Sequence, residues 1–109
     1  MNFKEYHAHI YYDESTHEKA LEVIERARQV EFFSVGRAHE KLVGPHPRWS
    51  CQLLFSNDDL PKAMPWILEN REGLTIFMHP DTGNDYIDHT DHTIWMGEML
   101  ELDTSRFKK

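Results

Sequence analysis

The stretch Tyr6–Asp13 constrains the fold of this chain more than any other part of the sequence. Aromatic and β-branched residues dominate it, which is typical of a β-strand. Because side chains alternate between the two faces of a strand, His7, His9 and Tyr11 share one face. The opposite face carries Tyr6, Ala8, Ile10 and Tyr12. We therefore expect one face of this strand to lie in the core and the other to carry a functional site.

The remaining segments alternate between strand-like and helix-like patterns. The pattern predicts strands at residues 1–12, 33–43, 49–55 and 74–78. Apolar residues at helical spacing predict one helix over residues 16–32 and another from about residue 62 to residue 70. Beyond them, we expect a short extra strand at residues 98–102 and a frayed end at 105–109.

This β-α-β-β-α-β order predicts a ferredoxin-like α+β fold in a single domain, residues 1–109. Right-handed crossovers place the first strand between the third and the fourth in a four-stranded antiparallel sheet. Both helices then cover one face, and a C-terminal extension follows the last strand. The histidine face would be open, and we expect a second copy of the chain to cover it, giving a homodimer.

Composition excludes several classes of function. The chain has 19 acidic and 12 basic residues, a net charge of −7, which argues against binding to nucleic acid or to an anionic membrane. We see no signal peptide and no transmembrane segment, and the lone Cys51 excludes an internal disulfide. These features predict a cytoplasmic protein. Eight histidines are the main compositional clue.

Histidines from separate segments are expected to meet on the open face. In the predicted sheet, the end of the fourth strand lies beside the start of the first, so His7, His9 and His79 converge. His89 follows a glycine-containing turn and can fold back over the same place. His46 lies in a loop at the opposite end of the sheet, and joins them only if the loop curls over the face or comes from a partner chain. Three or more imidazoles suit a divalent metal such as Fe(II) or zinc.

Two aspects of this candidate site stay open. A carboxylate often completes a non-haem iron site, and the candidates are Asp81, Asp85, Asp88 and Asp91. The alternative interpretation is that His7 and His9 are half-buried strand residues that form hydrogen bonds with their neighbours.

Aromatic and amide side chains are candidates for binding a ring-shaped substrate. The candidates for this substrate-binding role are Tyr11, Trp49, Gln52 and Trp95. Tryptophan and tyrosine are also common in cores and interfaces, which is the alternative role for three of them.

Three segments, HAHIYYD, GPHPRWSCQ and HPDTGNDYIDHTDHTIWMGE, resemble the small DOPA 4,5-dioxygenase family of fungi and bacteria. The resemblance spans residues 6 to about 98 and carries over His7, His9, His46, His79 and His89. It implies an extradiol ring-cleaving oxidoreductase that acts with O₂ on DOPA or a related catechol.

Together with the residues, this resemblance implies a non-haem Fe(II) cofactor held by His7, His9 and His79, with zinc as an alternative in a purified or crystallised form. His46 and His89 are then expected in catalytic roles, as acid/base groups or in contact with substrate. Two other classes of function stay open: a metal-dependent hydrolase of a small substrate, and a non-catalytic dimeric ferredoxin-like module.

Overall fold

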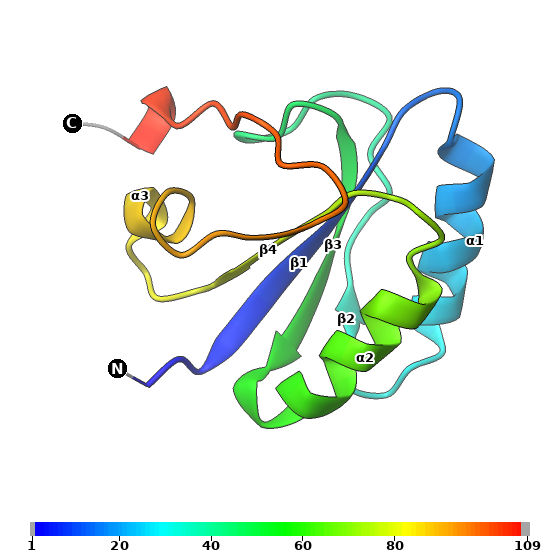
Figure 1. Ribbon diagram of the computed structural model, residues 1–109, viewed down its shortest axis with the longest axis horizontal. Helices are drawn as coiled ribbons and strands as arrows, with labels where there is room; N and C mark the ends of the chain where they lie inside the picture. Colours follow the sequence, from blue (N-terminus) through cyan, green and yellow to red (C-terminus); the bar gives the residue numbers. More distant parts are fainter. Residues whose placement is uncertain (1, 108–109) are drawn as a thin grey trace.

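The computed structural model describes residues 2–107 and contains a single five-stranded antiparallel sheet in the order β2-β3-β1-β4-β5 (Figure 1). The strands are β1 (Glu5–Tyr12), β2 (Ser34–Val35), β3 (Trp49–Ser56), β4 (Ile76–Pro80) and β5 (Ile94–Met96). The helices are α1 (His17–Arg28), α2 (Leu60–Asn70) and the short α3 (Asp85–Asp88), with 3₁₀ turns at Asn57–Asp59 and Ser105–Phe107. The predictions for Met1 and for residues 108–109 lie outside the described residues.

The predicted α+β plan is confirmed. β1 is central and pairs antiparallel with β3 on one side and with β4 on the other. Its register sets His7 opposite His79 on β4 and His9 opposite Gln52 on β3. The sheet has five strands instead of four, because β5 adds to the free edge of β4.

The second predicted strand is much shorter than expected. Only Ser34–Val35 pairs in the sheet, whereas residues 36–48 leave it as a long loop. Two backbone hydrogen bonds, Gly36 N–H to Gln52 O and His39 N–H to Ser50 O, still hold the start of this loop to β3. The loop sequence is polar and contains two prolines, so it offers no apolar face that would keep it in a ladder.

The C-terminal half also departs from the expected boundaries. β4 begins and ends two residues later than predicted, so His79 lies within the strand instead of just beyond it. The extra strand is Ile94–Met96 and not residues 98–102. The physical reason is burial, because Met96 is buried next to β4 whereas residues 98–102 are mostly exposed.

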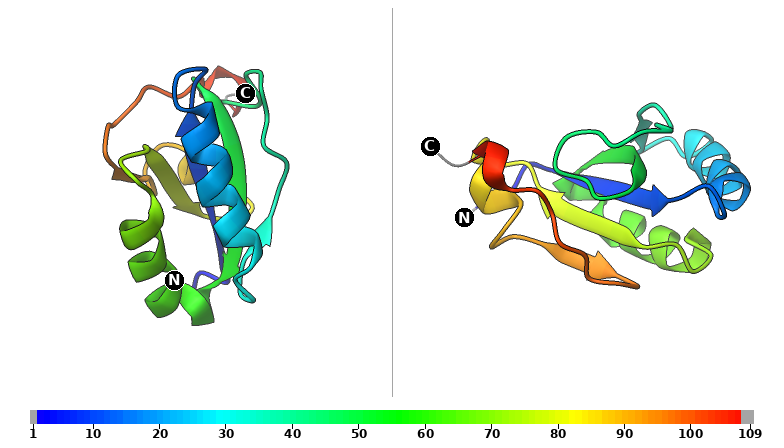
Figure 2. Two further views of the ribbon diagram at one scale, coloured as in Figure 1. Left: turned by 90° about the vertical axis from the view of Figure 1, so that its right-hand side faces the viewer. Right: turned by 90° about the horizontal axis from the view of Figure 1, so that it is seen from above.

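α1 and α2 pack side by side on one face of the sheet, as the left view of Figure 2 shows. The helix-facing residues of β1, including Ala8 and Ile10, form the core with the apolar stripes of both helices. The stripe of α1 consists of Ala20, Val23, Ile24 and Ala27. Within residues 2–107, no helix combines the length and the apolar character needed to span a membrane.

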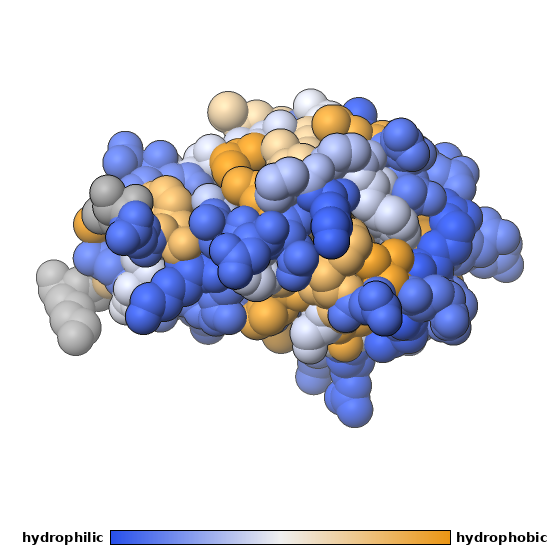
Figure 3. Space-filling model, turned by 90° about the horizontal axis from the view of Figure 1, so that it is seen from below, coloured by the Kyte–Doolittle hydropathy of each residue, from blue (hydrophilic) through white to orange (hydrophobic). Residues whose placement is uncertain are grey.

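The other face of the sheet is not open, which corrects the sequence-based expectation. Residues 36–48, α3 and the segment that follows β5 lie over it (Figure 1). Asp103 N–H donates to Pro45 O, and Arg48 forms an ion pair with Glu98 at 2.6 Å, so the covering segments are joined to each other. The reason for expecting a second copy of the chain on this face therefore no longer holds. On the face shown in Figure 3, hydrophilic side chains break up the apolar patches.

Two neighbouring residues of α2 test this packing. Ile67 is buried in the core, whereas Leu68 is 56% exposed. We expect Ile67→Ala to lower the free energy of unfolding by about 2–5 kcal/mol, through lost burial and the cavity left behind. Leu68→Ala should change it by no more than about 0.5 kcal/mol. Urea unfolding of both variants measures the difference, and equal losses would show that the core is not where the structure places it.

Candidate metal centre

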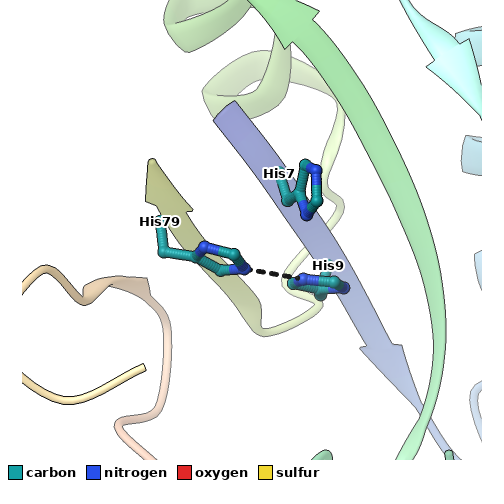
Figure 4. Close-up of side chains that lie close together, drawn as sticks. All are labelled: His7, His9 and His79. Carbon is teal, nitrogen blue, oxygen red and sulfur yellow. Dashed lines mark hydrogen bonds between the residues drawn. The ribbon is translucent and has the colours of Figure 1, made fainter. Parts of the chain in front are cut away.

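Three histidine side chains meet on the sheet face away from α1 and α2. His7 and His9 project from β1, and His79 projects from β4 toward both of them (Figure 4). One ring nitrogen from each histidine can be chosen so that the three atoms lie within 4.8 Å of one another. The Nε2 atoms of His9 and His79 are 3.2 Å apart. The strand register produces this geometry, since it sets His7 directly opposite His79.

Burial keeps two of these imidazoles neutral. His9 is 5% exposed and His79 is 3% exposed. Burial lowers the pKa of His9 well below its ordinary value, and repulsion from the neighbouring histidines is the second cause. Burial also lowers the pKa of His79 to about 4. Neutral imidazoles keep the nitrogen lone pairs that a metal ion needs.

The hydrogen bonds of His79 fit the role of a metal ligand. A carbonyl oxygen only accepts, so the contact of 2.8 Å between His79 Nδ1 and Pro80 O is an Nδ1–H donation. The neutral ring then has its lone pair at Nε2, the atom that faces His9. Metal-binding histidines commonly have this arrangement, in which a backbone carbonyl fixes the tautomer. Three converging imidazole nitrogens are a donor set that suits zinc or ferrous iron.

Two further histidines flank this triad. His46 reaches it from the 36–48 loop of the same chain, and its ring centroid lies 4.1 Å from that of His9. The loop therefore curls over the sheet face, which is one of the two routes that the sequence left open. His89 follows α3, and its ring centroid lies 4.4 Å from that of His79. The structure thus brings together all five histidines singled out from the sequence.

Each flanking histidine has a defined hydrogen-bond partner. His46 Nδ1 lies 2.6 Å from the hydroxyl of Tyr11, and His89 Nδ1 lies 2.7 Å from Asp85 O. Burial lowers the pKa of His46 to about 4, and burial raises the pKa of the Tyr11 phenol. Tyr11 is 1% exposed, and its hydroxyl contacts the ring of His46 within the protein.

The predicted substrate-binding residues divide between the two faces of the sheet. Trp95 lies near the histidines, with its ring centroid 6.2 Å from Tyr11, and Gln52 lines a cavity with His9 and His46. Trp49 lies on the opposite face, where it contacts Tyr12, so the expectation that it lines the same pocket is wrong. The reason is alternation along β3, where Ser50 and Gln52 share the histidine face and Trp49 does not.

Sequence reasoning missed Phe77, which forms the floor of the site. Its ring stacks on Trp95 at 4.7 Å between centroids and on His9 at 5.7 Å. Two positions before His79 in β4, Phe77 has the same strand phase. That phase was the signal that could have revealed it.

A cavity of about 280 Å³ opens beside His9 and His46. Its walls come from β1, β3 and the 36–48 loop. They are His9, Gly36, Arg37, His39, Val43, Gly44, His46, Ser50 and Gln52. The cavity gives a small molecule access to the side of the triad that carries His9.

The four candidate carboxylates lie in different environments. Asp81 Oδ2 is 3.6 Å from His7 Nε2, which makes Asp81 the candidate next to the triad. Asp88 is buried and accepts hydrogen bonds from the backbone N–H and the hydroxyl of Thr82. It therefore holds the turn between β4 and α3, a common role for aspartate. Asp85 and Asp91 are exposed.

Comparisons with known proteins identify relatives of this chain. The chain is 35% identical over 93% of its length to an uncharacterized 21.2 kDa protein from Botryotinia fuckeliana, and covers 62% of that protein. It is 30% identical over 91% of its length to a DOPA 4,5-dioxygenase from Amanita muscaria, and covers 47% of that enzyme. The chain thus spans about half to three fifths of the length of these curated relatives.

A solved structure shares the fold. It is the crystal structure of a Nostoc punctiforme protein that is described provisionally as a dioxygenase. The two chains superpose with a TM-score of 0.89 at 35% sequence identity, and the match covers 94% of this chain and 89% of the other. The model of the Dopa 4,5-dioxygenase family matches residues 6–106, nearly the whole chain and all five clustered histidines. This chain therefore belongs to the Dopa 4,5-dioxygenase family.

Proposed function

We propose that this protein is an extradiol ring-cleaving dioxygenase that acts on DOPA or a related catechol. In this proposal a non-haem Fe(II) is held by His7, His9 and His79. The observation that carries it is the convergence of three ring nitrogens within 4.8 Å of one another. Membership of the Dopa 4,5-dioxygenase family supports the reaction type.

A ferrous ion held by His7, His9 and His79 would supply open coordination positions for a catechol and for O₂. The residues of the protein position the substrate and accept or donate protons. His46 and His89 flank the triad and contact the oxygens of the bound substrate, one as hydrogen-bond partner and one as acid/base group. Phe77 and Trp95 provide an aromatic surface beside these groups.

Shielding from bulk water is the second contribution of the chain. The 36–48 loop, α3 and the segment after β5 cover the histidine face, and His9 and His79 are almost fully buried. Electrostatic interactions are stronger in such a site than in water. The cavity beside His9 and His46 provides the entry for a small ring-shaped molecule.

Metal binding tests the triad. We expect the wild-type protein to bind one Fe(II) per chain under anaerobic conditions. Because each loses a ligand, His7→Ala, His9→Ala and His79→Ala should each weaken binding by at least about 10-fold to 100-fold. His17→Gln is the matched control, because His17 stacks on Tyr12 at the other face of the sheet. Anaerobic titration followed by iron analysis measures the affinity, and equal binding by the triad variants and the control would contradict the proposal.

Oxygen uptake tests the reaction. We expect the Fe(II)-loaded protein to consume O₂ with DOPA, catechol or a protocatechuate-like acid, and to form a ring-opened product with visible absorbance. A phenol with a single hydroxyl is the control, because it cannot present two adjacent oxygens. An iron-loaded protein that takes up no O₂ with any of these catechols would refute the proposed activity.

The pH dependence of stability tests the neutral state of the buried histidines. Burial lowers the pKa of His46 and His79 to about 4, from the ordinary value of 6.5. Between these values the unfolded chain binds protons that the folded chain does not, so acid favours unfolding. The stabilisation is therefore present above pH 6.5 and is lost as the pH falls toward 4.

Urea unfolding of the metal-free protein at a series of pH values measures this loss. His79→Asn should show a shallower dependence, because it removes one of the groups concerned. An unfolding free energy that stays constant between neutral pH and pH 5, or an identical slope in the variant, would be inconsistent with buried neutral imidazoles.

A further inference from the structure

The two flanking histidines are held by different kinds of hydrogen-bond partner. His89 Nδ1 lies 2.7 Å from Asp85 O, and a backbone carbonyl can only accept. The hydrogen therefore belongs to His89 Nδ1. In the neutral ring, Nε2 then carries the lone pair, and His89 can accept a proton there.

His46 has the opposite arrangement. Its Nδ1 lies 2.6 Å from the hydroxyl of Tyr11, a group that can either donate or accept. Within residues 2–107, His46 is the only hydrogen-bond partner of that hydroxyl, and Tyr11 is 1% exposed. If His46 Nδ1 carried the hydrogen, the buried phenolic O–H would have no acceptor, which is unfavourable. The O–H of Tyr11 therefore donates to Nδ1, and the neutral ring of His46 has its hydrogen at Nε2.

We propose that these hydrogen bonds give the two flanking histidines, His46 and His89, different catalytic roles. Tyr11 is a positioning residue that makes His46 an Nε2–H hydrogen-bond donor, while the Asp85 carbonyl makes His89 the proton acceptor. This assignment rests on the proposed function. It gives different roles to His46 and His89, for which the sequence predicts the same role.

The two flanking histidines pack against different members of the triad. The ring of His46 packs on His9, and the ring of His89 packs on His79. The cavity adjoins the first of these pairs. In this proposal, a catechol bound at the triad receives a hydrogen bond from His46 and gives up a proton to His89.

The proton transfer is balanced within the site. The O–H bond of one catechol hydroxyl breaks, its electron pair stays on the oxygen, and the proton forms an N–H bond at His89 Nε2. The resulting imidazolium keeps its Nδ1–H bond to Asp85 O. The ring therefore needs no reorientation during the step. His46 stabilises the negative charge on the substrate by donating from Nε2–H.

Nuclear magnetic resonance tests the tautomers without activity. In the metal-free protein at neutral pH, the ring-nitrogen chemical shifts should show His46 protonated at Nε2 and His89 protonated at Nδ1. Tyr11→Phe keeps the buried ring and should change the spectrum of His46 but not that of His89. Tyr6→Phe is the matched control, since Tyr6 stacks on Phe55 in the core on the other face of the sheet. A wild-type His46 protonated at Nδ1 would overturn the assignment.

Kinetics of the Fe(II)-loaded enzyme test the two roles. An amide N–H can replace an imidazole N–H as donor, but an amide cannot accept a proton. We expect His46→Leu to lower kcat by about 100-fold to 1000-fold and His46→Gln to lower it much less. His89→Gln and His89→Leu should both lower kcat by about 100-fold to 10,000-fold. Tyr11→Phe should lower kcat by about 10-fold to 100-fold, with little change in KM.

The outcomes separate this inference from the function on which it rests. Suppose that the wild-type enzyme is active. If His89→Gln then recovers activity relative to His89→Leu, or if His46→Gln recovers none relative to His46→Leu, the division of roles alone would be overturned. A wild-type enzyme without O₂ uptake on any catechol would overturn the catalytic roles together with the proposed function. In that case, the spectra would still show whether Tyr11 fixes the tautomer of His46.

Discussion

The whole structure depends on the two-residue alternation of β1 at the centre of the sheet. Ladders on both sides, to β3 and to β4, fix the register of this strand. A slip of one residue would send every side chain to the wrong face. Ala8 and Ile10 would leave the core, and His7 and His9 would enter it. The same hydrogen bonds that hold the sheet together therefore also place two of the three histidines of the triad.

Burying so many imidazoles is unfavourable unless their polar atoms find partners. Within residues 2–107, no buried side-chain nitrogen or oxygen lacks a hydrogen-bond partner. The partners are backbone carbonyls for His79 and His89 and a phenol for His46. Each of these bonds fixes which ring nitrogen carries the hydrogen, so the interactions that make burial tolerable also set the chemistry of each ring.

The cover over the histidine face comes from segments that are far apart in the sequence. The 36–48 loop carries His46, α3 leads into His89, and Phe107 stacks on His89 at 4.7 Å between centroids. The hydrogen bond from Asp103 to Pro45 joins the first and last of these segments. The chain thus provides for itself the cover that was expected from a second copy.

Much of the candidate site could be predicted because short-range patterns encode it. Alternation placed His7 and His9 on one face, and the β-α-β-β-α-β order brought His79 beside them. Trp49 lies three residues before Gln52 in β3, so alternation puts the two side chains on opposite faces, and Gln52 is the one opposite His9. Phe77 was missed because a phenylalanine in a strand gives no chemical signal of its own.

The sequence by itself determined the order of the elements, the two faces of β1 and the family, since these depend on periodicity and on motifs that can be read locally. Only the tertiary structure decided the path of the 36–48 loop, the position of β5 and the hydrogen-bond partner of each histidine. The physical reason is that these features depend on contacts between distant residues, such as Tyr11 with His46. Such contacts leave no periodic pattern in the sequence, because each is made once, between side chains that meet only after the sheet has formed.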